Sequence, residues 1–216
     1  AGERCPERLL GMFAFAVWDT REETLFLARD RLGIKPLFYA EAGERLLFAS
    51  EMKALLAHGG VGREVDPQGL DHYLTFMYVP APGTILRGVR KLLPGHSLTW
   101  RAWKLLLRRY WALPEADEMP CTGSEAEAAE ELAALLQEAV RCRLMSEVPL
   151  GAYLSGGLDS SLIVAWMART SETGVNTFSV GFEERGFDER PWSRRVAERF
   201  GTRHRELVVG HHSIGD

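Results

Sequence analysis

Short apolar runs separated by polar turns fill the first part of the chain, a pattern typical of small strands and helices. Residues 11–18 are apolar on both faces, and residues 24–28 follow after a polar turn, which predicts a buried antiparallel hairpin. Residues 46–49 predict another strand. Ser50 can cap a helix over residues 51–58, which begins with an acid as the helix dipole prefers. These elements predict a mixed domain of sheet and helix.

A second helix start follows at Asp66, an N-cap residue that is succeeded by Pro67. The apolar face predicted for that helix consists of Leu70, Tyr73, Leu74 and Met77. Residues 100–111 interleave basic and aromatic side chains, which can indicate a nucleic-acid surface. Because the formal net charge of the chain is −4, we favour an edge strand that leads into a linker.

Charged residues gather just after the hairpin, where Arg29, Asp30, Arg31 and Lys35 surround Gly33. Taken by themselves, they are typical of a solvated loop with a turn residue inside it. Their spacing alone therefore indicates no catalytic site.

A stretch with Pro and Gly over residues 113–123 indicates a boundary between two domains. We accordingly assign residues 1–113 to the first domain, 114–123 to a linker and 124–216 to the second domain. Ser124 and Glu127 form a capping box that opens a helix. The apolar stripe predicted along this helix consists of Ala128, Leu132, Leu135, Leu136, Ala139 and Val140.

Strands and helices alternate through the second domain. The predicted strands span residues 148–154, 175–180 and 204–209, and a helix over residues 158–169 joins the first two. A further helix is expected to be capped by Asp188, to face inward with Trp192, Val196 and Phe200, and to end at Gly201. This alternation implies an α/β, doubly wound parallel sheet that binds its ligand at the carboxyl ends of the strands, two of which end at Leu154 and Val180.

A Ser- and Gly-rich turn joins the first of these strands to its helix. Gly156 and Gly157 have no side chain to keep a phosphate away from the backbone, and the amides that begin the helix carry partial positive charge. The hydroxyl donors of the turn are Ser155, Ser160 and Ser161. Asp159 would repel phosphates unless a cation lay between them, so this turn predicts a phosphate site with magnesium.

Two other interpretations of the turn fit less well. A flexible linker would not have a buried strand before it and a helix after it. The phosphate loop of Walker type needs four residues between its glycines and a following Lys, and no Lys occurs after Lys104. The turn therefore predicts nucleotide chemistry that uses no lysine at the phosphates.

Composition narrows the class of protein only a little. With 216 residues, 46% hydrophobic and 26% charged, the chain can form one substantial core or two smaller ones. Its three cysteines lie far apart, which predicts neither a disulfide framework nor a zinc site and favours a reducing, cytoplasmic setting. No apolar run approaches the ~20 residues of a membrane helix, so we expect no membrane as partner. Because the formal net charge is −4, we expect no nucleic acid as partner either.

Isolated histidines give no metal signal. His58, His72, His96 and His204 stand alone, and His211 and His212 are close to the last residue. Structural or solvated roles are therefore expected for them. The chain starts at Ala1 rather than Met, and we expect it to be a fragment.

Ser155-Gly156-Gly157-Leu158-Asp159-Ser160 after an apolar strand resembles the pyrophosphate loop of the ATP pyrophosphatase superfamily. Members of that superfamily activate a carboxylate or carbonyl as an adenylate and release pyrophosphate. The loop alone leaves open several enzymes, among them GMP synthetase, NAD synthetase, argininosuccinate synthetase and tRNA lysidine synthetase.

Earlier stretches of the chain narrow the choice among these enzymes. Residues 11–19, 28–39 and 48–55 look like the later part of the glutaminase domain of glutamine-hydrolysing asparagine synthetase, and residues 78–84 and 93–96 look like its connecting region. The resemblance implies an α+β N-terminal-nucleophile (αββα) domain, present in part, followed by part of an ATP pyrophosphatase domain. It also implies a catalytic cysteine upstream of Ala1, so Cys5 is not that nucleophile.

The resemblance implies a reaction in which ATP adenylates aspartate and ammonia from glutamine displaces AMP. It implies ATP and magnesium as cofactors, with pyrophosphate held by the turn and magnesium held by Asp159. The matching positions for adenine and ribose are Leu154 and Val180, for which plain core packing is an equally good explanation. We expect the fragment itself to be inactive, and whether the protein forms a homodimer stays open.

Two alternatives to this reaction are kept. One is a related amidotransferase or cyclase, like a β-lactam synthetase, that adenylates a carboxylate other than that of aspartate. The other is a non-catalytic nucleotide-binding protein on the same scaffold. The acceptor carboxylate cannot be chosen from these residues.

Overall fold

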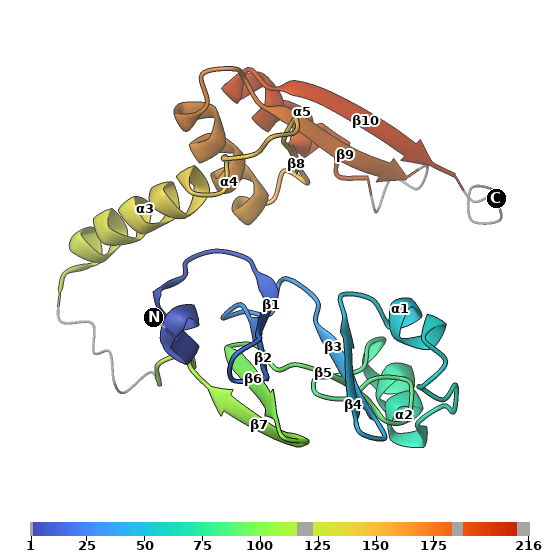
Figure 1. Ribbon diagram of the computed structural model, residues 1–216. Coiled ribbons are helices and arrows are strands. Elements are labelled where there is room, and N and C mark those ends of the chain that lie inside the picture. Colours follow the sequence, from blue (N-terminus) through green and yellow to red (C-terminus); the bar gives the residue numbers. More distant parts are fainter. Residues whose placement is uncertain (1, 116–122, 183–187, 211–216) are drawn as a thin grey trace. The chain divides into compact units, whose positions relative to one another are not determined.

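The computed structural model describes residues 2–115, 123–182 and 188–210, and the chain divides into two compact units. Unit 1 spans Ala1–Met119 and unit 2 spans Pro120–Asp216, and each is described by itself (Figure 1). Most of the predicted linker over residues 114–123 lies outside the described residues. The same holds for His211 and His212.

Unit 1 begins with a 3-10 helix, η1 (Gly2–Arg8), and its first sheet is antiparallel with the order β1-β2-β6-β7. The strands are β1 (Ala14–Asp19), β2 (Thr24–Arg29), β6 (His96–Arg101) and β7 (Lys104–Arg109). The predicted hairpin is confirmed, because β1 pairs with β2 from Ala14 opposite Arg29 to Asp19 opposite Thr24. β2 lies inside the sheet and is buried along most of its length.

One prediction about this sheet is wrong and another is confirmed in part. β1 is an edge strand, and half of the Val17 and Trp18 surface is exposed, so the hairpin is buried on the β2 side only. The edge strand predicted over residues 100–111 is present as β7, but the first residues of that range belong to β6 and to a turn. Ala102 and Trp103 both adopt positive φ, which reverses the chain between β6 and β7 and leaves β7 at the other edge.

The second sheet of unit 1 has the order β4-β3-β5 and is also antiparallel. Its strands are β3 (Phe38–Ala42), β4 (Arg45–Ala49) and β5 (Val89–Lys91), and the helices beside it are α1 (Met52–Ala57) and α2 (Pro67–Phe76). One buried cluster joins the two sheets, with Leu27 of β2, Tyr39 of β3 and Leu98 of β6 among its members. Burial of these side chains is the main attraction between the sheets.

Of the two helix N-caps predicted in unit 1, one is confirmed and one is wrong. Asp66 caps α2 as expected, and its carboxylate accepts from the amides of Gln68 at 2.9 Å and Gly69 at 3.2 Å. Ser50 does not cap α1, because the N-cap residue is Glu51 and its side chain makes no capping bond. The predicted apolar face of α2 is largely exposed, and Leu74 is 73% accessible.

The solvated loop expected around Asp30 is not what the structure has, because Asp30 is only 1% exposed. Its two carboxylate oxygens accept from the amides of Ile34 and Lys35, both at 2.9 Å. Burial raises the pKa of Asp30, but the amides of Lys35, Ile34, Phe13 and Leu32 outweigh burial and hold the pKa below its ordinary value. The loop that resembles a charged turn is therefore a fixed part of the core.

Arg29 closes the same loop from the other side. Its guanidinium donates to the carbonyl oxygens of Gly33 at 2.6 Å, Lys35 at 2.8 Å and Leu92 at 2.6 Å. The Tyr110 hydroxyl donates to the Arg29 carbonyl at 2.6 Å, and burial raises the pKa of Tyr110 to about 12. These contacts tie β2, the loop after it and the end of the second hairpin together.

Unit 2 consists of three parallel strands in the order β10-β9-β8 with helices between them. Its elements are α3 (Glu125–Arg141), β8 (Gly151–Tyr153), α4 (Leu158–Thr170), β9 (Asn176–Phe182), α5 (Arg190–Phe200) and β10 (Arg203–Val209). The alternation of strand and helix is as predicted. The capping box of Ser124 and Glu127 is confirmed as well, with both reciprocal bonds present.

The central strand β9 has two different faces. Thr177, Ser179 and Gly181 are buried, whereas Phe178, Val180 and Phe182 are each about 40% exposed. α5 contacts both β9 and β10, and α4 contacts α5, so these helices cover the face with the small side chains. Within the described residues the apolar face of β9 is the open one.

Several details of unit 2 differ from the sequence predictions. The strand expected over residues 148–154 is limited to β8. The N-cap of α5 is Glu189 rather than Asp188, whose carboxylate instead pairs with Arg190. Trp192 is exposed and stacks with Arg195, while Ser193 and Ala197 are buried and Val196 packs against the same core cluster as Ala197, as predicted.

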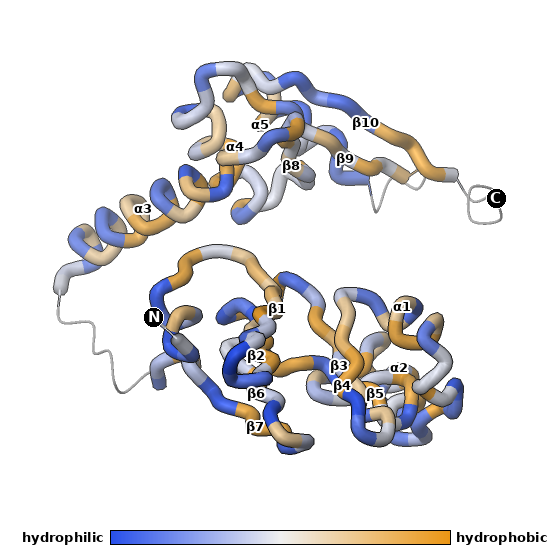
Figure 2. Tube along the Cα trace, in the orientation of Figure 1, coloured by the Kyte–Doolittle hydropathy of each residue, from blue (hydrophilic) through white to orange (hydrophobic). Residues whose placement is uncertain are grey.

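The predicted stripe of α3 is visible in Figure 2, where apolar and polar residues alternate along the helix. Most of the stripe is exposed, including Leu132 and Leu135, and only Val140 at its end is buried. Contacts of α3 with α4 explain this burial.

We expect Asp30→Asn to lower the stability of unit 1 by roughly 2–3 kcal/mol, because an amide group cannot accept from both backbone N–H groups. The folded pKa lies below the unfolded value of about 4. The contribution of Asp30 is therefore present above pH 4 and is lost as the pH falls through the folded pKa.

Urea unfolding followed by pulsed hydrogen exchange of unit 1 peptides measures this effect at pH 7 and at pH 3. The difference between wild type and Asp30→Asn should shrink at pH 3. Asp71→Asn, at an exposed position on α2, is the matched control and should change little. A difference that is equal at both pH values contradicts the assignment to the Asp30 carboxylate.

Candidate functional site

The Ser- and Gly-rich turn lies between the carboxyl end of β8 and the first turn of α4. Leu154 continues β8, since its amide donates to the Phe178 carbonyl oxygen at 2.8 Å, and its side chain is 1% exposed. α4 begins at Leu158 with Gly157 as its N-cap residue. The first amides of α4 therefore face the turn with no side chain at the cap to accept from them.

Gly156 packs directly against the backbone of α5. Its φ is +84°, and a Cβ added to it would lie 2.5 Å from the carbonyl carbon of Trp192 and 2.6 Å from the amide nitrogen of Ser193. Real Cβ atoms do not approach backbone so closely. Only glycine fits this position, both for its conformation and for its space. We call residues 155–157 and the first turn of α4 the phosphate loop, after the role that the sequence predicts for them.

The hydroxyl groups of the phosphate loop bond to one another and to its backbone. Ser155 Oγ lies 2.9 Å from Ser160 Oγ and accepts from the Gly157 amide at 3.2 Å, and Ser160 Oγ donates to the Gly157 carbonyl at 3.3 Å. The Ser161 amide donates to the same carbonyl at 3.0 Å, as the first bond of α4. These contacts bring two of the three predicted hydroxyl donors together, those of Ser155 and Ser160, and fix the shape of the turn.

Asp159 lies on the first turn of α4 and is exposed. Among the residues that the structure describes, its carboxylate makes no hydrogen bond or ion pair. The described ranges also contain no group of three or more His, Cys, Asp and Glu residues that could hold a metal ion. Any cation at Asp159 would need oxygen ligands from a bound molecule, which is how Mg²⁺ is commonly held beside phosphates.

Leu154 and Val180 border the same hollow of about 260 Å³ beside the phosphate loop. Its wall is formed by Tyr153, Leu154, Ser155, Phe178, Ser179, Val180, Phe182 and Glu189. Leu154 is nearly inaccessible as a whole residue, whereas Val180 is 41% exposed. The carboxyl ends of β8 and β9 thus place a polar turn next to an apolar hollow.

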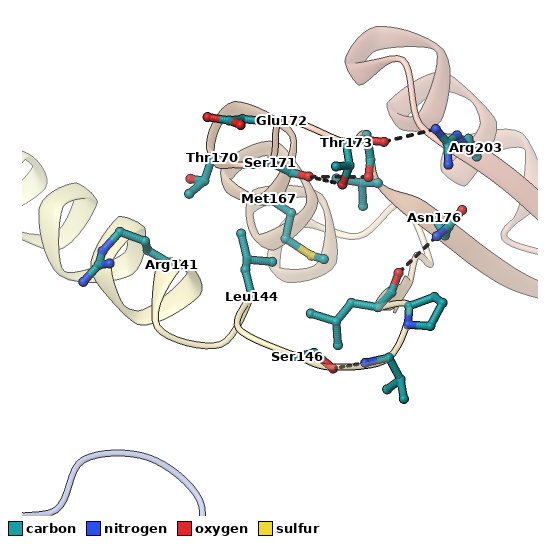
Figure 3. Close-up of a pocket in the computed structure, with 15 residues that line it drawn as sticks. Arg141, Leu144, Ser146, Met167, Thr170, Ser171, Glu172, Thr173, Asn176 and Arg203 are labelled. Atoms are coloured by element: carbon teal, nitrogen blue, oxygen red, sulfur yellow. Dashed lines mark hydrogen bonds between the residues drawn. The ribbon is translucent and has the colours of Figure 1, made fainter.

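A larger cavity, of about 560 Å³, lies at the amino ends of the strands (Figure 3). Arg203 there donates to the Thr173 carbonyl at 3.1 Å, and Asn176 donates to the Leu150 carbonyl at 3.2 Å. Arg141 pairs with Glu138. The polar side chains of this larger cavity are thus engaged with neighbouring loops and helices. We therefore assign the site to the carboxyl ends of the strands, although the hollow there is smaller.

His204 belongs to a buried polar cluster that the sequence did not indicate. Its ring nitrogens lie 2.9 Å from Thr177 Oγ1 and 3.1 Å from Ser179 Oγ. A histidine that stands alone in the sequence gives no sign of such partners. The alternation of Thr177 and Ser179 with apolar residues in β9 is the one signal that points to a polar layer under α5.

Within residues 2–115, 123–182 and 188–210, no helix has both the length and the apolar character needed to cross a membrane.

We expect Gly156→Ala to destabilise unit 2 by about 2–4 kcal/mol, because the new methyl group overlaps the α5 backbone and the positive φ is unfavourable. Gly157→Ala is the matched control. Its φ is −69°, and its added Cβ would meet only Ser155 Oγ at 3.4 Å, so we expect a loss below about 1 kcal/mol. Urea unfolding with pulsed hydrogen exchange of unit 2 peptides separates the two outcomes, and equal losses contradict the close approach.

Family comparisons match both units. Residues 1–111 match the family model described as glutamine amidotransferase domain, and residues 131–214 match the one described as asparagine synthase. These matches cover the antiparallel sheets of unit 1 and the phosphate loop of unit 2.

Curated relatives match nearly the whole chain. Asparagine synthetase (glutamine-hydrolyzing) 3 of Bacillus subtilis is 37% identical over 229 residues, covering 99% of this chain and 37% of the relative. Asparagine synthetase (glutamine-hydrolyzing) 1 of the same species is 35% identical over 209 residues, covering 96% and 32%. Amidase chyE of Penicillium rubens is 34% identical over 211 residues, covering 90% and 31%.

The chain spans about a third of the length of these curated relatives. Their names and the order of the two family models confirm the resemblance seen in the sequence. Since the first model covers more than half of the 216 residues, the chain belongs to the glutamine amidotransferase domain family and carries an asparagine synthase segment after that domain.

Proposed function

We propose that the protein is an ATP-dependent ligase that makes asparagine from aspartate, with glutamine as the source of ammonia. The observation that carries the proposal is the phosphate loop at the carboxyl end of β8, in a chain whose first unit matches a glutamine amidotransferase domain. The proposal includes the finer folds, an N-terminal-nucleophile domain and a doubly wound ATP pyrophosphatase domain. The proposal also includes a cytoplasmic location, in keeping with the three widely spaced cysteines.

In this proposal the phosphate loop holds the β- and γ-phosphates of ATP. The donors are the first amides of α4 and the hydroxyls of Ser155, Ser160 and Ser161, and the first two hydroxyls would exchange bonds within the loop for bonds to phosphate. The adenosine occupies the hollow between Leu154 and Val180, where an apolar wall suits a base and strand-end backbone supplies its polar contacts. The nucleotide would then lie across the carboxyl ends of the strands.

Asp159 is the residue we propose for magnesium. Its exposed carboxylate has no partner among the described residues and begins the helix that faces the phosphates. One carboxylate together with phosphate oxygens is a suitable ligand set for Mg²⁺. Bound there, the ion would neutralise charge that develops on the leaving pyrophosphate.

The proposed reaction has two steps that balance without a redox partner. A side-chain carboxylate oxygen of aspartate attacks the α-phosphorus of ATP, the bond from that phosphorus to the bridging oxygen breaks, and pyrophosphate leaves. Ammonia from glutamine then attacks the acyl carbon of β-aspartyl-AMP, and AMP leaves as the nitrogen loses a proton. The loop amides and hydroxyls contribute by stabilising charge on the pyrophosphate as it forms.

A second candidate is an enzyme of the same scaffold that adenylates a carboxylate other than that of aspartate. The similarity to amidase chyE of Penicillium rubens favours keeping it, since proteins with this sequence pattern carry names other than asparagine synthetase. Both candidates use the phosphate loop in the same way. They differ only in the acceptor.

Aspartate-dependent exchange of labelled pyrophosphate into ATP tests the proposal on the intact protein. We expect exchange in wild type and a loss of at least a hundredfold in Asp159→Ala, about 2.7 kcal/mol of transition-state stabilisation. Glu125→Ala is the matched control, because Glu125 is also an acid in the first turn of a helix. It should leave exchange unchanged.

Two results decide between the candidates. Exchange that depends on aspartate alone supports the synthetase, and equal stimulation by other carboxylates supports the second candidate. Full exchange in Asp159→Ala removes the proposed role of that carboxylate. Absence of exchange with every carboxylate contradicts both enzymes.

A further inference from the structure

A buried cluster of hydroxyl groups surrounds His204 between β9, β10 and α5. The cluster consists of His204, Thr177, Ser179, Ser193 and Thr202. The side chains of Thr177 and Ser193 are fully buried, and the His204 side chain is 12% exposed. Such groups stay inside a protein only when they bond to each other, so the cluster acts as one connected network.

Ser193 connects this cluster to the phosphate loop. Its hydroxyl lies 3.2 Å from Ser179 Oγ, 3.4 Å from His204 Nε2 and 3.1 Å from the Arg190 carbonyl. Its backbone amide is the atom that lies 2.6 Å from the position of a Cβ on Gly156. The residue held by the cluster is therefore also part of the surface on which the loop rests.

The two ring nitrogens of His204 face different elements. Nδ1 lies 2.9 Å from Thr177 Oγ1 of β9, which in turn lies 2.7 Å from Thr202 Oγ1. Nε2 faces Ser179, Ser193 and the Glu206 carboxylate, the last at 3.5 Å.

Glu206 extends the contacts on the Nε2 side back to α5. Both of its oxygens accept from the Arg194 guanidinium of α5, at 2.7 and 2.6 Å. Arg194 lowers the pKa of Glu206 by this bond, so the carboxylate stays charged beside the ring. The Nε2 side thus reaches α5 through Ser193 in its first turn and through the Glu206–Arg194 pair. The Nδ1 side reaches only the other end of α5, where the Thr202 amide donates to the Ala197 carbonyl at 3.0 Å.

We propose that His204 is a positioning residue for the phosphate loop, acting through Nε2 and Ser193 on the first turn of α5. This inference rests on the proposed function, because it concerns the binding of pyrophosphate by that loop. His204 itself touches no phosphate in this arrangement. A small shift of α5 would move Gly156 with it and misdirect the donors of the loop, and displacements near 1 Å are costly for such sites.

Two substitutions separate the ring nitrogens. His204→Gln places an amide nitrogen close to the position of Nε2, and His204→Asn places one close to the position of Nδ1. The probe is magnesium pyrophosphate, titrated by calorimetry into the intact protein, with thermal unfolding measured on the same samples. We expect His204→Asn to weaken binding about tenfold and His204→Gln to stay within about threefold of wild type.

Ser193→Ala tests the same path without changing the histidine. We expect about fivefold weaker binding, and the double variant Ser193→Ala/His204→Asn should be no weaker than about tenfold, because both changes remove one interaction. This variant decides the question if His204→Asn does not fold. His96→Gln is the matched control, a half-buried histidine of unit 1 whose Nδ1 lies 2.7 Å from the Pro94 carbonyl, and it should bind as wild type does.

The outcomes distinguish this inference from the function on which it rests. Wild-type protein that binds neither magnesium pyrophosphate nor magnesium ATP overturns both. Wild-type binding with unchanged affinity in His204→Asn and Ser193→Ala overturns the positioning role alone. Equal affinity losses in His204→Asn and His204→Gln, in proportion to their thermal stability, also overturn it, since general destabilisation does not depend on which nitrogen is kept.

Discussion

The close approach of Gly156 to the α5 backbone is the constraint on which the site of unit 2 depends. The amides of a turn after a parallel strand can bind a ligand only where no other part of the protein bonds to them. On the side of Gly156, this turn packs against the backbone of Trp192 and Ser193. The loop is therefore held between the end of β8 and the first turn of α5. The loop cannot lie closer to α5, because the space between Gly156 and the α5 backbone is already filled.

The same constraint explains the polarity of β9. A strand between two others in a parallel sheet is expected to be apolar on both faces. β9 instead carries Thr177 and Ser179 under α5 and keeps its large apolar side chains on the open face. Small hydroxyl side chains let α5 lie close to the sheet, and hydrogen bonds fix its position more specifically than side-chain packing alone would.

Local signals in the sequence were sufficient for the elements and for the turn. Asp66 before Pro67, the Ser124 capping box and the glycines after an apolar strand depend on neighbours a few residues away, and the structure has each where predicted. The errors concern partners that are distant in sequence. Hydrophobicity predicts Trp192 on the inner face of α5, yet Trp192 is exposed and its small neighbour Ser193 is the buried residue.

Long-range contacts also decide the state of the charged groups. Asp30 was interpreted as part of a solvated loop because charged residues surround it in sequence, and nothing local shows that the amides of Ile34 and Lys35 turn back onto it. His204 was likewise uninformative, since Thr177 and Ser193 come from other elements. The polar groups of the phosphate loop could be found from spacing, but the groups that hold it in place could not.

The two units use buried polar groups for the same physical purpose. In unit 1 the Asp30 carboxylate and the Arg29 guanidinium bond to backbone N–H and C=O groups and fix a loop that no apolar contact could orient. In unit 2 the His204 cluster fixes a helix end against which a glycine turn rests. Apolar burial supplies most of the attraction in both units, but it is non-directional. A site that must aim donors at a ligand needs directional contacts behind it, which is why each fixed loop has a satisfied polar group at its base.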